Sequence, residues 1–191
     1  MQLENRFDVA APPEEAWNLL NDVPAVLPCM PGAELLEVVG PDSWKARLQV
    51  RLGPISLQFL ADLTRERTEL QERQAVISVD AREAKGRGKA SATLTSTVQD
   101  APGGSRVSIV TDLALRGPLA QYGRPIVAPV AEQLTQQFAA CISQKLAATT
   151  SEHAREPEAR QPASAADGSR AIGLRFLLGA VWRSITRKES R

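Results

Sequence analysis

Apolar residues in the stretch 117–147 recur with the spacing of an amphipathic helix. They follow one another at steps of three, four and seven residues and form a single stripe: Leu119, Ile126, Val130, Leu134, Phe138, Cys141 and Ile142. Gly117-Pro118 begins the stretch, and Pro125 and Pro129 fall early in it. Because proline disturbs helix hydrogen bonding, we expect a bent or loosened first section and a regular helix after about Pro129.

Most of the chain before this helix alternates between apolar and polar residues, which is typical of strands with one buried face. The alternation predicts strands at residues 3–9, 35–39, 44–52, 55–64, 75–81, 90–98 and 107–115. A helix carrying Ala16, Trp17, Leu19 and Leu20, followed by a short helical or turn segment at 23–29, separates the first two. Short turn-rich connections favour an antiparallel sheet. We therefore expect an α+β helix-grip fold, in which a seven-stranded antiparallel sheet wraps around one long C-terminal helix.

The concave side of such a sheet is wider than one helix stripe, so the fold predicts a cavity lined mainly by carbon between helix and sheet. For any single apolar residue on these faces, a place in an ordinary filled core is the alternative. The loop around Pro31-Gly32 is expected near the entrance. The predicted ligand-binding residues are Met30, Leu57, Phe59, Ile109, Leu113, Leu115, Tyr122, Ile126, Val130 and Leu134.

Composition divides the chain into a helix-grip domain at residues 1–148, a disordered linker at 149–169 and a basic amphipathic helix at 170–191. The last segment carries six basic residues and one acidic residue, whereas the rest of the chain has seventeen and twenty-one. Leucine and tryptophan on one helix face with arginine around it indicate binding to an anionic membrane surface. Docking on a partner or a disordered basic end are the alternatives. The predicted membrane-binding residues are Arg170, Leu174, Arg175, Leu177, Leu178, Val181, Trp182, Arg183, Ile185 and Arg187.

Residues that could carry catalysis are few. The single histidine, His153, lies in the predicted linker, and Cys29 and Cys141 are expected to form no disulfide framework and to sit in a reduced cytosolic protein. The carboxylates of Asp62, Asp80 and Asp112 fall on polar strand faces. We therefore predict a protein that is not an enzyme and has no metal site, and the absence of a basic platform with interleaved aromatics argues against nucleic acid.

Several short motifs stand out along the chain: Ala11-Pro12 with Trp17, the stretch from Pro28 to Ala33, the stretch from Val50 to Ile55, and Gly117-Pro118-Leu119-Ala120 with Gly123-Arg124. Together they resemble the CoxG family of carbon monoxide dehydrogenase subunits, which belongs to the START-like (Bet v 1-like, SRPBCC) helix-grip superfamily. The resemblance covers roughly residues 1–147. It implies a helix-grip fold and association with a molybdenum-containing carbon monoxide dehydrogenase or a related hydroxylase, which such proteins recruit to the cytoplasmic membrane.

Together these features predict a non-catalytic peripheral protein on the inner face of the cytoplasmic membrane. It would recruit the oxidoreductase and carry a lipophilic molecule such as a quinone, with no covalent cofactor. A purely structural recruitment or assembly factor without a ligand is the first alternative. An enzyme on the same fold is the second.

Overall fold

The computed structural model describes residues 1–52 and 55–153. Its elements are the strands and helices β1 (Gln2–Val9), α1 (Pro13–Asn21), α2 (Val23–Val26), the 3-10 turn η1 (Leu27–Cys29), β2 (Ala33–Gly40), β3 (Ser43–Leu52), β4 (Ile55–Glu69), β5 (Gln74–Glu83), β6 (Lys89–Ala101), β7 (Gly104–Arg116), the 3-10 turn η2 (Gly117–Gln121) and α3 (Arg124–His153). The seven expected strands are all present, and most are a few residues longer than the alternation predicts.

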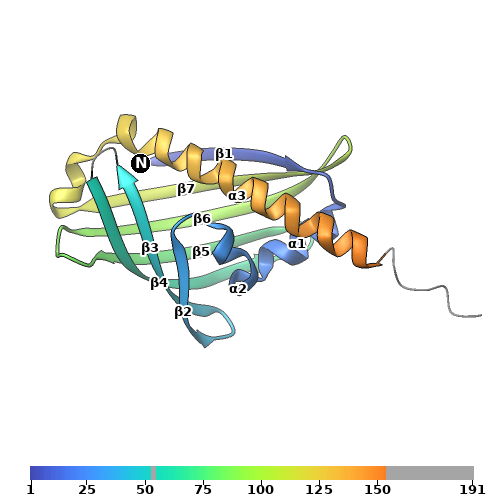
Figure 1. Cartoon of the computed structure of the whole chain (residues 1–191), viewed down its shortest axis with the longest axis horizontal. Coiled ribbons are helices and arrows are strands. Elements are labelled where there is room, and N and C mark those ends of the chain that lie inside the picture. Colours follow the sequence, from blue (N-terminus) through green and yellow to red (C-terminus); the bar gives the residue numbers. More distant parts are fainter. Residues whose placement is uncertain (53–54, 154–191) are drawn as a thin grey trace, which may run out of the picture. The chain divides into compact units, whose positions relative to one another are not determined.

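The strands form one antiparallel sheet in the order β1-β7-β6-β5-β4-β3-β2. Every neighbouring pair is antiparallel, and β1 and β2 are its two edges. Figure 1 shows α3 lying across one face of this sheet, with α1 and α2 near its second half. The expected helix-grip fold is thereby confirmed.

The long helix begins later than its apolar stripe. Gly117–Gln121 is a 3-10 turn, and α3 runs from Arg124 with Pro129 inside it. Since proline has no amide hydrogen, the carbonyl of Pro125 loses its helical partner, which fits the expected loosened start. The helix continues to His153, so the first five residues of the range 149–169 are helical. The rest of the predicted linker and the whole predicted membrane-binding segment lie outside the described residues.

The β5–β6 and β6–β7 connections each make a close backbone approach that depends on glycine. At Gly104, a Cβ would lie 2.1 Å from the carbonyl oxygen of Val9, and at Gly88 it would lie 2.2 Å from that of Arg116. Both contacts are too short for any side chain, so these positions hold the β6–β7 and β5–β6 connections against neighbouring strands. Among the described residues, no helix combines the length and hydropathy that a membrane-crossing segment requires.

Candidate ligand-binding site

The concave face of the sheet carries a row of small side chains. Ala46, Ala61, Ala81 and Ala90 are direct cross-strand neighbours on β3, β4, β5 and β6. On β4 the larger Leu57 and Phe59 stand on the same face and are 2% and 9% exposed. Because a methyl group rises far less from the sheet than leucine or phenylalanine, the row forms a low floor. We name it the alanine row.

The apolar interior falls into two clusters. The first joins α1, η1, the second half of α3 and the facing strands: Val9, Ala11, Ala16, Trp17, Val26, Cys29, Ala75, Val98, Val107, Phe138, Ile142 and Leu146. The second lies at the other end of the sheet: Leu57, Phe59, Ala61, Ala81 and Leu119. Between them, inward-facing Ile77, Leu94 and Leu113 are only partly buried. A helix-grip core therefore exists at each end, and the middle of the concave face is less completely covered.

The first half of α3 is more exposed than its second half. Ile126 is 46% exposed and Val130 and Leu134 are partly buried, whereas Phe138 is 7% and Ile142 is 0% exposed. The predicted apolar stripe therefore seals the interior only in the second half of the helix. Near this transition the rings of Phe7 on β1 and Phe138 pack edge to face, with centroids 6.1 Å apart.

A groove of about 650 Å³ runs between α3 and the edge strand β1. Leu3, Asn5 and Phe7 of its lining occupy inward positions of β1, so the groove opens onto the concave face. It is more polar than the carbon-lined cavity that the sequence predicts, because its α3 wall consists of residues on the flank of the helix and includes none of the apolar stripe. The full lining is Leu3, Glu4, Asn5, Arg6, Phe7, Arg124, Ala128, Pro129, Glu132, Thr135, Gln136 and Ala139.

The structure distributes the ten predicted ligand-binding residues over several places. Leu57, Phe59, Leu115 and Tyr122 belong to or pack against the second cluster, and Met30 and Ile109 pack against the first. Leu113, Val130 and Leu134 are partly buried between them, and Ile126 is exposed. None of the ten lines the groove. The groove residues on β1 carried a usable signal, since the alternation of residues 3–9 already assigns Leu3, Asn5 and Phe7 to one face.

A second, shallower hollow of about 370 Å³ lies on the convex face. Its lining includes Met1, Asp80, Asp112 and the hydroxyl residues Ser78 and Ser91. The N-terminal ammonium of Met1 donates to the carbonyl oxygen of Leu113 at 2.6 Å. Asp62, Asp80 and Asp112 are all exposed, as their place on polar strand faces predicts.

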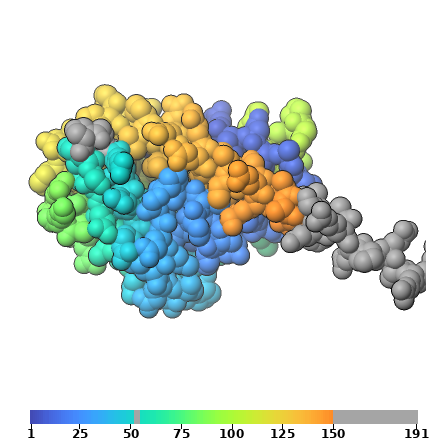
Figure 2. Space-filling view, viewed as in Figure 1, coloured from blue at the N-terminus to red at the C-terminus, as the bar shows by residue number. Residues whose placement is uncertain are grey.

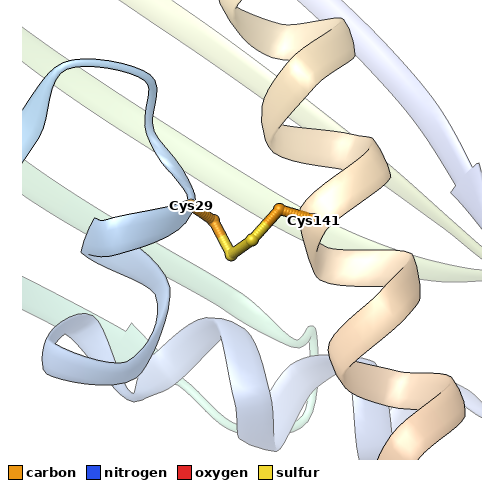
Figure 3. The surroundings of a disulfide bond; sticks show 2 residues. All are labelled: Cys29 and Cys141. Atoms are coloured by element: carbon orange, nitrogen blue, oxygen red, sulfur yellow. A yellow bond between two sulfur atoms is a disulfide. The ribbon is translucent and has the colours of Figure 1, made fainter.

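Cys29 and Cys141 form a disulfide, contrary to the expectation that they stay reduced and unconnected. The bond joins the end of η1 to the middle of α3, and Figure 3 shows the two side chains meeting between these elements. The residues are 112 positions apart, and their Cα atoms are 5.4 Å apart. Since Met30 follows Cys29 directly, the disulfide fixes the loop expected at the entrance to one side of α3.

Buried and partly buried charges are held by local partners. Arg65, which faces inward from β4, donates to Asp42 Oδ1 at 3.1 Å and to the carbonyl oxygen of Asn21, and lies 5.1 Å from the Trp44 ring centroid.

Glu83 is 4% exposed, and its carboxylate accepts the amides of Lys85 and Arg87 at 2.8 and 3.0 Å. Burial alone would raise the pKa of Glu83, but these amides and the charge of Arg87 outweigh it and lower the pKa. Glu83 therefore stabilises its own turn as an anion.

Comparisons with known proteins agree with this architecture. A conserved protein from Geobacillus kaustophilus matches with a TM-score of 0.69 and 19% identity, over 78% of this chain and 97% of that one. The Zhui aromatase/cyclase from Streptomyces sp. R1128 matches with a TM-score of 0.57 and 14% identity, over 78% and 95%. Ara h 8.0201 matches with a TM-score of 0.52 and 13% identity, over 78% and 98%. At these identities the likeness shows the fold alone.

No curated protein matches the chain in sequence. The sequence model of one family, the G subunit of carbon monoxide dehydrogenase (CoxG), matches residues 6–147. That range runs from β1 to α3 and contains both clusters, the disulfide and nine of the twelve groove residues. The chain therefore belongs to the CoxG family of carbon monoxide dehydrogenase subunits and has its helix-grip fold.

Proposed function

We propose that this protein is a non-catalytic accessory protein that brings a molybdenum-containing carbon monoxide dehydrogenase, or a related hydroxylase, to the inner face of the cytoplasmic membrane. The family match supports the partner, because the family is described as a subunit of that enzyme. The strongly basic segment 170–191 supports the membrane, because arginine with leucine and tryptophan favours an anionic lipid surface.

The groove between α3 and β1 is the observation that carries the second part of the proposal, a lipophilic ligand. Its volume of about 650 Å³ is within the range of small-molecule sites and several times that of the cavities of about 150 Å³ that admit benzene. Leu3, Phe7 and Ala128 supply apolar walls, and the side-chain amide of Asn5 is able to donate a hydrogen bond to a carbonyl oxygen. A ring with polar oxygens and an apolar tail fits this mixed lining better than a pure hydrocarbon does.

A quinone has this chemistry and also answers a need of the partner. Oxidation of carbon monoxide with water releases carbon dioxide, two protons and two electrons, and reduction of a quinone to a quinol consumes two protons and two electrons. The oxidoreductase works in water, whereas quinones dissolve in the bilayer. A membrane-bound carrier with a ring-sized groove would connect the two.

Two adjacent α3 residues allow a matched test of the ligand. Ala139 lines the groove and Ala140 is exposed outside it, so Ala139→Trp should obstruct the groove and Ala140→Trp should not. The full-length protein, purified from membranes, is analysed by native mass spectrometry and solvent extraction for retained quinone. We expect wild type and Ala140→Trp to retain it and Ala139→Trp to lose at least nine-tenths.

Absence of quinone from the wild type, with no binding of added quinone, would contradict the carrier and leave a recruitment factor without a ligand. The membrane part is tested separately, by vesicle flotation of the full chain and of a chain ending at Glu156. The shorter chain keeps all of the described residues, and circular dichroism verifies that it folds. Flotation that does not depend on residues 157–191 would contradict the proposed role of the tail.

A further inference from the structure

The basic residues of the folded domain are of two kinds. Residues 1–153 contain fifteen lysines and arginines and eighteen acidic residues, so the domain as a whole is slightly acidic. Seven of the fifteen are in salt bridges: Arg6, Lys45, Arg47, Arg65, Arg67, Arg73 and Arg106. Within residues 1–52 and 55–153, no salt bridge is found for the other eight, seven of which belong to segments at one end of the molecule.

We name these seven the basic end: Arg51, Arg82, Lys85, Arg87, Lys89, Arg116 and Arg124. Arg82, Lys89 and Arg116 are direct cross-strand neighbours on β5, β6 and β7. Figures 1 and 2 place the end of β3, the β5–β6 hairpin, η2 and the start of α3 together at this end. Six of the seven side chains are exposed and Arg87 is partly buried.

The fold itself holds these charges together. The only acidic residue of the β5–β6 turn, Glu83, is buried and accepts main-chain amides of that turn. Gly88 brings the turn against the carbonyl of Arg116, which keeps the cations of β5, β6 and β7 in one patch. Three like charges in neighbouring register repel one another. Their clustering without acidic partners therefore indicates an anionic ligand surface rather than a contribution to stability.

Exposed aliphatic residues lie among these cations. Leu60 is 43% exposed and is the cross-strand neighbour of both Arg47 and Arg82. Ile126 is 46% exposed and is two residues from Arg124, which also lines the groove. The large exposed apolar side chains of the described part of the chain include no aromatic ring, so the stacking platform of single-stranded nucleic acid binding is lacking. Cations with aliphatic side chains instead suit lipid headgroups and the acyl boundary.

We propose that the basic end is a second membrane-binding site, in the folded domain itself, which docks on anionic phospholipid and brings the Arg124 end of the groove to the bilayer. This site is independent of the predicted tail helix. Like the proposed function, this site requires a membrane, but it does not require a bound quinone.

The test uses the full chain and two triple variants with the same loss of charge. The first, Arg82→Gln, Lys89→Gln and Arg116→Gln, removes the central row of the basic end. The control, Arg67→Gln, Arg106→Gln and Lys145→Gln, removes three cations elsewhere. Binding is measured to vesicles of phosphatidylcholine and phosphatidylglycerol in equal parts and to phosphatidylcholine alone, with circular dichroism to verify folding.

We expect the first variant to bind the anionic vesicles roughly a hundredfold more weakly, because each of the three basic residues near such a surface contributes roughly fivefold and the contributions multiply. The control should stay within about twofold of wild type, and binding to neutral vesicles should be weak for all three. Equal losses in both variants, or no loss in the first, would overturn the proposal, as would tight oligonucleotide binding that the first variant loses while its vesicle binding is unchanged. Quinone content measured on the same proteins separates this outcome from failure of the carrier proposal.

Discussion

At the scale of single residues, Glu83 shows how a buried carboxylate serves the turn that holds the basic end. Its pKa in the folded protein lies below the ordinary value of 4.5. A depressed pKa stabilises the folded state above the unfolded pKa, and this stabilisation is lost as pH falls through the folded pKa. We therefore expect the urea concentration at the unfolding midpoint to decrease as the pH is lowered below about 4.5. Protonation of Glu83 should contribute to this decrease.

Glu83→Gln tests this component directly. The amide can still accept a hydrogen bond but carries no charge, so the variant should be less stable than wild type at pH 7 and the difference should shrink as pH falls below 4.5. Urea unfolding of both proteins at a series of pH values measures it. The Asp8–Arg106 pair also lowers the pKa of Asp8, and it is present in both proteins. A constant difference at all pH values would show that Glu83 acts only through its shape.

At the scale of elements, the disulfide connects two segments that contact each other through the first cluster. Its closed loop of 112 residues predicts a stabilisation of about 4–5 kcal/mol from restriction of the unfolded chain. Reduction should therefore lower the unfolding midpoint of the wild type strongly, and a Cys29→Ser/Cys141→Ser variant should match the reduced wild type and not respond to reductant. Equal stability of oxidised and reduced wild type would contradict this.

The elements also show what the sequence could predict. Strict alternation placed β3 and most of β4, because each has one buried or partly buried face there, whereas the last residues of β4 are exposed on both faces and were not predicted. The disulfide was missed because a separation of 112 residues says nothing about distance in space. The groove was missed because the periodicity of α3 identifies the stripe that faces the sheet, whereas the lining depends on which flank meets the edge strand β1. That flank carries polar residues such as Glu132 and Gln136, which a periodicity argument assigns to solvent.

At the scale of the whole molecule, the two proposed membrane contacts are connected to opposite ends of α3. The helix of thirty residues is about 45 Å long, with Arg124 of the basic end at its start. Sixteen residues separate His153 from Arg170, and a chain of that length spans at most about 55 Å. The connection is therefore just long enough for the basic end and the tail to bind one membrane together, which would multiply their affinities.

Deleting residues 157–164 tests this arrangement without changing the net charge, since the segment contains one acidic and one basic residue. The remaining connection spans at most about 30 Å, which is shorter than α3, so only one contact could reach the membrane at a time. We expect affinity for anionic vesicles to fall at least tenfold, to the level of the basic-end triple variant. Replacing the same residues by glycine and serine at equal length should preserve it. If the deletion binds as tightly as wild type, the two sites do not act on one membrane together.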